Sequence, residues 1–86
     1  MKKVKMMILD DCPYCHQAFS MMERLCREHE EYRAVDIEVI EVSKEPEKIK
    51  GYNYWYVPTY FVDNVKIHEG VPTLEKVEEV YRQALK

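Results

Sequence analysis

The sequence has no apolar run long enough to cross a bilayer, because a membrane-spanning helix needs about 20 predominantly apolar residues. One apolar segment, residues 4–9, has the character of a signal-peptide core, but it is too short and runs directly into Asp10 and Asp11. We therefore predict neither membrane insertion nor export, no membrane partner, and a cytoplasmic location.

An excess of basic residues is also absent, since 13 Lys and Arg face 16 Asp and Glu, for a net charge of −3 at pH 7. Both signs are spread along the chain without the basic stripe typical of nucleic-acid-binding proteins, so we predict no nucleic-acid partner. Internal repeats, low-complexity segments and linkers are lacking as well. The 86 residues are enough for one modest hydrophobic core, which predicts a single domain over residues 1–86.

Cysteine is scarce, and its number, three, is odd. An odd number is a poor match to the disulfide frameworks of small secreted proteins and suits a cytosolic redox motif better. Cys12 and Cys15 form a Cys-x-x-Cys pair after the apolar segment 4–9. The following residues, 17–32, contain no Gly or Pro and are rich in Met, Leu, Glu and Arg. The pair is therefore predicted to lie where a strand turns into a helix.

The position of this pair predicts its chemistry. Residues three apart on a helical turn have Cβ atoms roughly 5–6 Å apart, and a disulfide requires Cα atoms about 5.5–6 Å apart, so Cys12 and Cys15 can be joined with little movement. Pro13 suits the first helical position, which places Cys12 at the N-cap. The unpaired N–H groups and the positive end of the helix dipole favour a thiolate at Cys12, and the thiolate is the attacking species.

The apolar pattern along the whole chain predicts an α/β fold in the order β-α-β-α-β-β-α with a four-stranded mixed sheet. The first two strands need the long helix as a crossover and should be parallel, whereas a short Asp63-Asn64 turn predicts an antiparallel hairpin. Thr73 is the predicted N-cap of the last helix. The predicted elements cover residues 3–9, 13–29, 34–42, 43–50, 59–62 and 65–68, and a final helix from about residue 73.

The predicted helices each carry one apolar face. In the first helix this face holds Cys15, Phe19, Met22 and Cys26, and in the last it holds Leu74, Val77, Val80, Tyr81, Ala84 and Leu85. On this pattern Cys26 is a core residue rather than a third redox partner. His16 is predicted to be an exposed helical histidine that, when protonated, can alternatively help to hold the thiolate.

A zinc site is an alternative use of the cysteines, because Cys12, Cys15, Cys26 and His29 have the spacing of a three-Cys, one-His site. If residues 13–29 form one helix, however, Cys26 lies about 16 Å along the axis from Cys15 at ~1.5 Å per residue. Ligands of one zinc ion all lie roughly 2.0–2.3 Å from it. We therefore predict no metal site of this kind, and we predict that His29 is a solvated residue at the helix end.

The tetrapeptide Cys12-Pro13-Tyr14-Cys15 resembles the dithiol active site of glutaredoxins, in which His16 and Ala18 are common continuations. Val57-Pro58-Thr59 falls where the thioredoxin superfamily has its cis-proline. The resemblance covers the whole chain and implies a thioredoxin-like, glutaredoxin-type fold with Cys12 and Cys15 as catalytic residues, supported by Pro13 and Tyr14. It also implies that Tyr14, Val57 and Pro58 bind substrate, with the Val57 backbone pairing with substrate backbone.

The chain departs from glutathione-using glutaredoxins at the positions that hold glutathione. Leu9 stands where that family usually has a basic residue, and Tyr56 stands in place of a threonine. The family's glycine pair appears as His68-Glu69, followed by Gly70, and the acidic residue that follows it has no clear counterpart before Thr73. Asp10 and Asp11 add two carboxylates next to Cys12, which should oppose formation of the thiolate and repel anionic glutathione.

We predict a small thiol–disulfide oxidoreductase that uses a Cys12/Cys15 dithiol cycle on disulfide-containing protein or small-molecule substrates. The expected reductant is an enzyme of the thioredoxin-reductase type rather than glutathione. No cofactor is required, glutathione is the alternative co-substrate with a poorly matched binding motif, and the protein is expected to be a monomer. The alternative function is a non-catalytic module that binds a metal or an iron–sulfur cluster through the same cysteines. The aromatic residues between 52 and 60 can form a wall beside the site or close the core.

Overall fold

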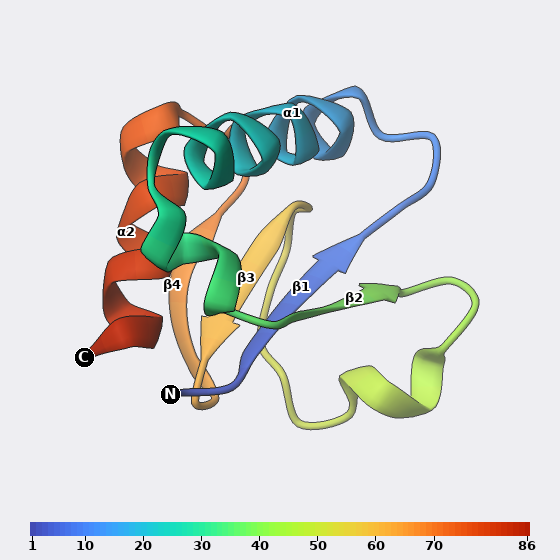
Figure 1. Ribbon diagram of the computed structural model, residues 1–86. Helices are drawn as coiled ribbons and strands as arrows, with labels where there is room; N and C mark the ends of the chain where they lie inside the picture. The colour runs from blue at the N-terminus through green and yellow to red at the C-terminus, as the bar shows by residue number, and fades with distance from the viewer.

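The sheet at the centre of the computed structural model, which describes residues 1–86, has four strands in the order β2-β1-β3-β4. Figure 1 shows α1 and α2 against the sheet, with the segment between β2 and β3 passing on its other side. None of the helices is long and apolar enough to span a membrane. The elements are β1 Val4–Ile8, α1 Pro13–Glu28, the 3-10 helix η1 Glu30–Ala34, β2 Ile37–Glu41, the 3-10 helix η2 Pro46–Ile49, β3 Thr59–Val62, β4 Val65–Glu69 and α2 Leu74–Leu85.

The strand directions confirm the predicted mixed sheet. β1 pairs in parallel with β2 after the crossover through α1, and it pairs antiparallel with β3 on its other side. β3 and β4 form the antiparallel hairpin. Asp63 and Asn64 at its turn have φ values of 47° and 68°, the left-handed pair that a tight two-residue hairpin turn requires.

The helix α1 begins as predicted, with Cys12 at the N-cap and Pro13 in the first turn. Its buried face differs from the predicted one. Cys15, Ala18 and Leu25 are buried, whereas three of the four predicted stripe positions are only half-buried at the edge of that face. The predicted face is displaced because it omits Ala18, a small residue that is fully buried in the core cluster. The half-buried residues are Phe19, Met22 and Cys26.

β2 shows a second difference from the prediction. Residues 34–36 lie outside the strand. The alternation of Val35, Ile37 and Val39 in the sequence predicts that these three side chains share the inward face, but Val39 is 40% exposed. Ile40 is buried instead, on the sheet face that looks away from the helices, where it packs with Met7 and Phe61. The alternation does not predict the buried position because β2 is an edge strand, and its one buried residue, Ile40, belongs to the apolar cluster on the face away from the helices.

The predicted helix over residues 43–50 is a single turn of 3-10 helix that starts at Pro46. The residue types predict Ser43 as its N-cap and Gly51 as its end. Ser43 does not cap the turn, because its N–H and hydroxyl both donate to the Glu41 carboxylate. Gly51 follows the turn as predicted, with φ +85°. Ile49 and the following residues cover the small apolar cluster on this face of the sheet.

The helix α2 begins as predicted, since the Thr73 hydroxyl accepts from the Lys76 N–H. Val77, Val80, Tyr81 and Ala84 are buried against the sheet and α1. Leu85, predicted on the same face, is 38% exposed because it is the last residue of the helix and extends past the sheet.

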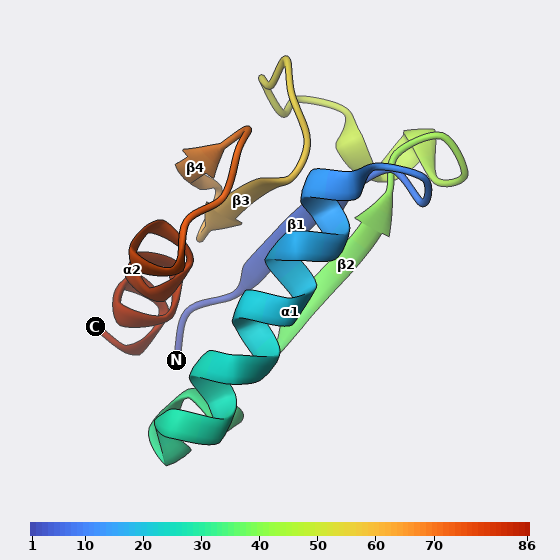
Figure 2. The ribbon, with the colours of Figure 1, turned by 90° about the horizontal axis from the view of Figure 1, so that it is seen from above.

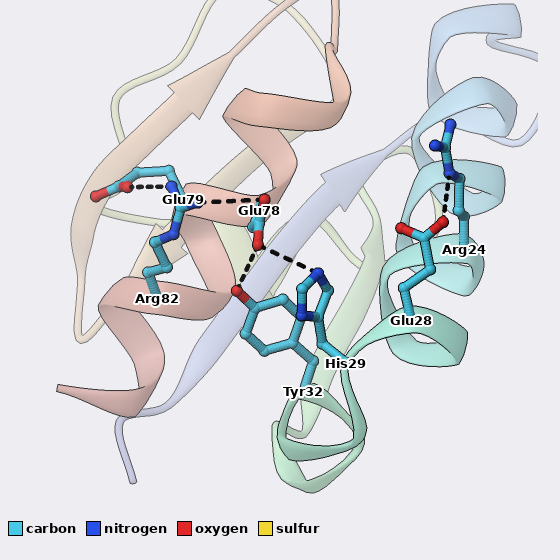
Figure 3. A network of polar contacts seen from close by, with 7 residues as sticks. All are labelled: Arg24, Glu28, His29, Tyr32, Glu78, Glu79 and Arg82. Atoms are coloured by element: carbon cyan, nitrogen blue, oxygen red, sulfur yellow. Dashed lines mark hydrogen bonds and ion pairs between the residues drawn. The ribbon is translucent and has the colours of Figure 1, made fainter.

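Figure 3 shows a network of polar contacts that joins α2 to the end of α1 and the unpredicted 3-10 helix η1. The Tyr32 hydroxyl donates to the Glu78 carboxylate at 2.7 Å, and Arg82 lies 3.3 Å from its other oxygen. His29 Nε2 is 3.6 Å from Glu78, and the His29 ring packs against Tyr32 with centroids 4.8 Å apart. His29 thus lies at the end of α1 with its side chain 39% exposed, as predicted, and the unpredicted contacts with Glu78 and Tyr32 arise because η1 returns the chain to α2.

Candidate active site

The two cysteines of the first helical turn differ in access. Cys12 is half-buried, and its sulfur accepts a hydrogen bond from the Cys15 N–H at 3.4 Å, as an N-cap side chain does. Cys15 is fully buried beneath it. Both are free thiols. An incoming disulfide can therefore reach Cys12 but not Cys15.

Burial raises the pKa of the Cys15 thiol to about 12, and the hydrogen bond with Cys12 acts in the same direction. Cys15 is therefore protonated at neutral pH, whereas the species that attacks a disulfide is the thiolate. The environment makes Cys15 a poor first nucleophile. Cys15 is instead placed next to the Cys12 sulfur, where it can act in the second step of an exchange reaction.

The loop before β3 brings a residue far along the chain to Cys12. The Val57–Pro58 peptide bond is cis, and Pro58 is buried. The Cys12 thiol donates to the Val57 carbonyl at 3.7 Å, and the Val57 N–H makes no hydrogen bond within the protein. Figures 1 and 2 both place this loop beside the start of α1. The structure thus brings Cys12, Cys15, Val57 and Pro58 together.

The aromatic residues between 52 and 60 separate into three groups. Tyr60 is fully buried, with its hydroxyl 3.2 Å from the Met22 sulfur. Tyr52 and Tyr54 cover the small cluster on the sheet face away from the helices. Trp55 and Tyr56 are 87% and 71% exposed on the loop that leads to Val57. These two, together with Tyr14, which is 46% exposed in the turn of the cysteines, are the aromatic residues available to a partner.

The acidic residues beside the motif are partly neutralised. The Asp10 carboxylate lies 2.6 Å from Lys44 Nζ, and this contact raises the pKa of Lys44. Asp11 is exposed and forms no ion pair. The ring of His16 contacts the Asp10 carbonyl oxygen at 2.6 Å and forms no hydrogen bond to Cys12, so it is an exposed helical histidine as predicted.

Two carboxylates that the sequence reasoning missed fix the loops around the cysteines. Glu41, at the end of β2, accepts from the Asp10 N–H at 2.8 Å, and hydrogen bonds from Ser43 and from Asp10 lower its pKa to about 2. Glu69, at the end of β4, accepts from the backbone N–H groups of Trp55 and Tyr56. The sequence contains a signal for Glu69 only, which stands at a position where glutaredoxins have glycine, and none for Glu41.

The alternative zinc ligands are not gathered in the structure. Cys15 and Cys26 lie on one uninterrupted helix. The Cys26 thiol donates to the Tyr81 hydroxyl at 3.6 Å, and His29 faces Glu78. No group of three or more Cys, His, Asp or Glu side chains is arranged to hold a metal ion.

Comparisons with known proteins agree with this arrangement. A family model described as "Thioredoxin domain" matches residues 2–82. A protein named thioredoxin from Methanocaldococcus jannaschii is 31% identical over 87 residues, an alignment that covers 99% of this chain and 100% of that relative.

Proposed function

The chain belongs to the thioredoxin family and is a thiol–disulfide oxidoreductase in the general sense, and we propose that it reduces disulfides through a Cys12/Cys15 dithiol cycle. One observation carries this proposal. An accessible N-cap thiol, Cys12, lies directly above a buried, protonated thiol, Cys15, on the same helical turn.

The cycle follows from the different access of the two thiols. The Cys12 thiolate attacks one sulfur of the substrate disulfide, so that a Cys12–substrate bond forms, the substrate S–S bond breaks, and the second substrate sulfur leaves with the electron pair and takes a proton from solvent. Cys15 then loses its proton and attacks the Cys12 sulfur, which releases the first substrate sulfur as a thiol. The substrate gains two electrons, and the protein is left with a Cys12–Cys15 disulfide.

The Val57 backbone supports the first step of this cycle. Its carbonyl lies beside the Cys12 sulfur, and its N–H has no partner within the protein. An extended substrate segment can pair with these groups in the manner of an added β-strand, which brings its disulfide to Cys12. We include Tyr14 and Pro58 in the same substrate-binding surface.

The proposed reductant is an enzyme of the thioredoxin-reductase type. The relative covering the whole chain is named thioredoxin. The positions at which glutaredoxins hold glutathione carry Leu9, Tyr56 and Glu69, and Glu69 is occupied with the chain's own backbone. The cycle requires no bound cofactor, and we place it in the cytoplasm, where such reductases keep thiols reduced. In this proposal the Cys-Pro-Tyr-Cys motif resembles that of glutaredoxins, but its reductant is the one that thioredoxins use. We propose that the protein acts as a monomer.

A side-by-side turnover assay tests the reductant. Reduction of insulin disulfides is followed with NADPH and thioredoxin reductase, and in parallel with NADPH, glutathione reductase and glutathione. We expect turnover with the first system and much slower turnover with the second. Faster turnover with glutathione would show that the departures from the glutaredoxin motif do not prevent the use of glutathione. Absence of both activities would refute the dithiol cycle.

A further inference from the structure

In the segment from Trp55 to Pro58, Val57 packs against both apolar clusters and Pro58 is buried, whereas Trp55 and Tyr56 are held through their backbone. The N–H groups of Trp55 and Tyr56 donate to the same oxygen of the Glu69 carboxylate, the latter at 2.9 Å. The Tyr56 carbonyl accepts from the Thr59 hydroxyl, and the Pro58 carbonyl accepts from the N–H of residue 70 at 2.9 Å. Val57, between these anchors, has no backbone hydrogen bond to the rest of the chain except the contact of its carbonyl with the Cys12 thiol.

Packing cannot order the first half of this segment, because the side chains of Trp55 and Tyr56 are in solvent. Trp55 is 87% and Tyr56 71% exposed, so neither gains much stability from burial. Ordering a residue costs backbone entropy, which other interactions must offset. Hydrogen bonds to a charged group are stronger than those between neutral groups, and Glu69 accepts two of them. Glu69 is therefore the main anchor of Trp55 and Tyr56, the residues that lead into Val57.

A β-bulge directs the Glu69 carboxylate to this place. Thr59 pairs with Glu69 and Phe61 pairs with Lys66, with the register shift between these pairs. The extra residue on β4 puts Lys66 and Glu69 on the same face of the sheet, although an odd separation normally places two strand residues on opposite faces. Lys66 Nζ lies 2.8 Å from the second carboxylate oxygen and fixes its orientation.

The environment of Glu69 keeps it ionised. Its side chain is 18% exposed. The ion pair with Lys66, and then the N–H groups of Trp55 and Tyr56, lower the pKa of Glu69 to about 2. The anchor is thus charged throughout the range of pH in which disulfide exchange is useful.

We propose that Glu69 is a positioning residue for disulfide exchange with polypeptides, which holds the Trp55–Pro58 segment so that the Val57 backbone is presented beside Cys12. This inference rests on the proposed function. It predicts a selective defect: a polypeptide disulfide needs the ordered Val57 backbone, whereas a small disulfide needs only the Cys12 sulfur. Loss of the anchor should therefore slow the first reaction and spare the second.

The sole tryptophan of the chain, Trp55, reports the order of the segment directly. The variants are Glu69→Ala, which removes the anchor, Glu69→Gln, which keeps an acceptor oxygen without the charge, and Lys66→Met, which removes only the support of the carboxylate. Glu75→Ala is the matched control, because Glu75 is an exposed carboxylate on α2. For each reduced protein we would measure the rate constants with insulin and with neutral 4,4′-dithiodipyridine, together with the time-resolved fluorescence anisotropy of Trp55.

In Glu69→Ala we expect the insulin rate to fall about tenfold or more, the size of one lost charge-assisted hydrogen bond. The dithiodipyridine rate should change by less than about twofold, and the Trp55 anisotropy should show fast local motion. Glu69→Gln and Lys66→Met should show the same defects to a smaller degree, which keeps the test decisive if Glu69→Ala does not fold. Glu75→Ala should match the wild type.

Equal rates with insulin in the wild type and all three variants would overturn the inference, and so would an equal loss with both substrates. A wild type that reduces neither substrate refutes the dithiol cycle instead. In that case the anisotropy still shows whether Glu69 orders the segment, so the two failures are distinguishable.

Discussion

At the scale of single residues, the division of labour between Cys12 and Cys15 comes from burial. The two sulfurs share one helical turn, but one is accessible at the N-cap and the other is covered by the core. The helix end favours an anion at the first position, and burial disfavours one at the second. One local geometry thus provides a nucleophile and a resolving thiol.

The raised pKa of Cys15, about 12, predicts how the second step depends on pH. Burial is its main cause and persists when Cys12 is held in a mixed disulfide. Below this pKa the thiolate fraction rises about tenfold per pH unit, so resolution should accelerate by roughly that factor. Mixing the reduced protein with a chromogenic aromatic disulfide should release one thiol on attack and a second on resolution.

The second, slower phase of thiol release should therefore show the steep pH dependence between pH 6 and 9, and Cys15→Ser should lack this phase. A resolution rate that does not change with pH would show that Cys15 is deprotonated by a neighbouring group in the mixed disulfide.

The two aspartates beside the motif predict an effect on glutathione. Asp11 has no ion pair, whereas Lys44 balances the charge of Asp10. Asp11→Asn should raise the glutathione-dependent rate roughly two- to fivefold at low salt, the range of exposed charge interactions, and Asp10→Asn should raise it less. Lys44→Met should lower the rate, because it leaves the Asp10 charge unbalanced. An Asp10→Asn, Asp11→Asn double variant with the wild-type rate would show that these carboxylates do not act on glutathione.

At the scale of elements, α1 and α2 pack through a polar edge as well as an apolar face. Cys26 lies at that edge, with its thiol donating to the Tyr81 hydroxyl. Burial raises the pKa of Tyr81, and the contact with Cys26 acts in the same direction. Together with the Glu78 network shown in Figure 3, this contact joins the end of α1 to α2 far from the reactive thiols.

Cys26→Ala should therefore cost stability and leave turnover nearly unchanged. The smaller side chain leaves a small cavity and an unpaired hydroxyl, a loss of about 1 kcal/mol in the free energy of unfolding by denaturant titration. Tyr81→Phe is the matched variant, because it removes the hydroxyl and keeps the ring. A folded Cys26→Ala protein with a large loss of turnover would identify Cys26 as a third functional thiol.

The elements that could be predicted are those whose own residues determine them. Pro13 and Thr73 mark the helix starts, and the left-handed Asp63-Asn64 turn marks the hairpin. The 3-10 helices were missed or misplaced because they follow from contacts at a distance, such as Tyr32 with Glu78. The contribution of Glu69 could not be predicted either, since it depends on a bulge in the register of β3 and β4.

At the scale of the whole molecule, the two faces of the sheet differ. The helices bury a core cluster of 14 residues on one face, whereas 3 buried residues lie under the irregular segment on the other. Figure 2 shows the start of α1 and the loop before β3 at the same end of the molecule. The site therefore lies where α1, which packs on the larger core, meets the loop that leads from the irregular segment into β3. Glu69 anchors this loop.

The assignment of Cys12 as the attacking thiol and Cys15 as the resolving thiol can be tested by trapping the mixed disulfide. Reduced Cys12→Ser and Cys15→Ser variants would be mixed with excess insulin and their intact masses measured under non-reducing, denaturing conditions. We expect a covalent insulin-chain adduct on Cys15→Ser and none on Cys12→Ser, which still carries Cys26 as an internal control. Equal adducts on both variants, or an adduct on Cys12→Ser alone, would contradict this assignment.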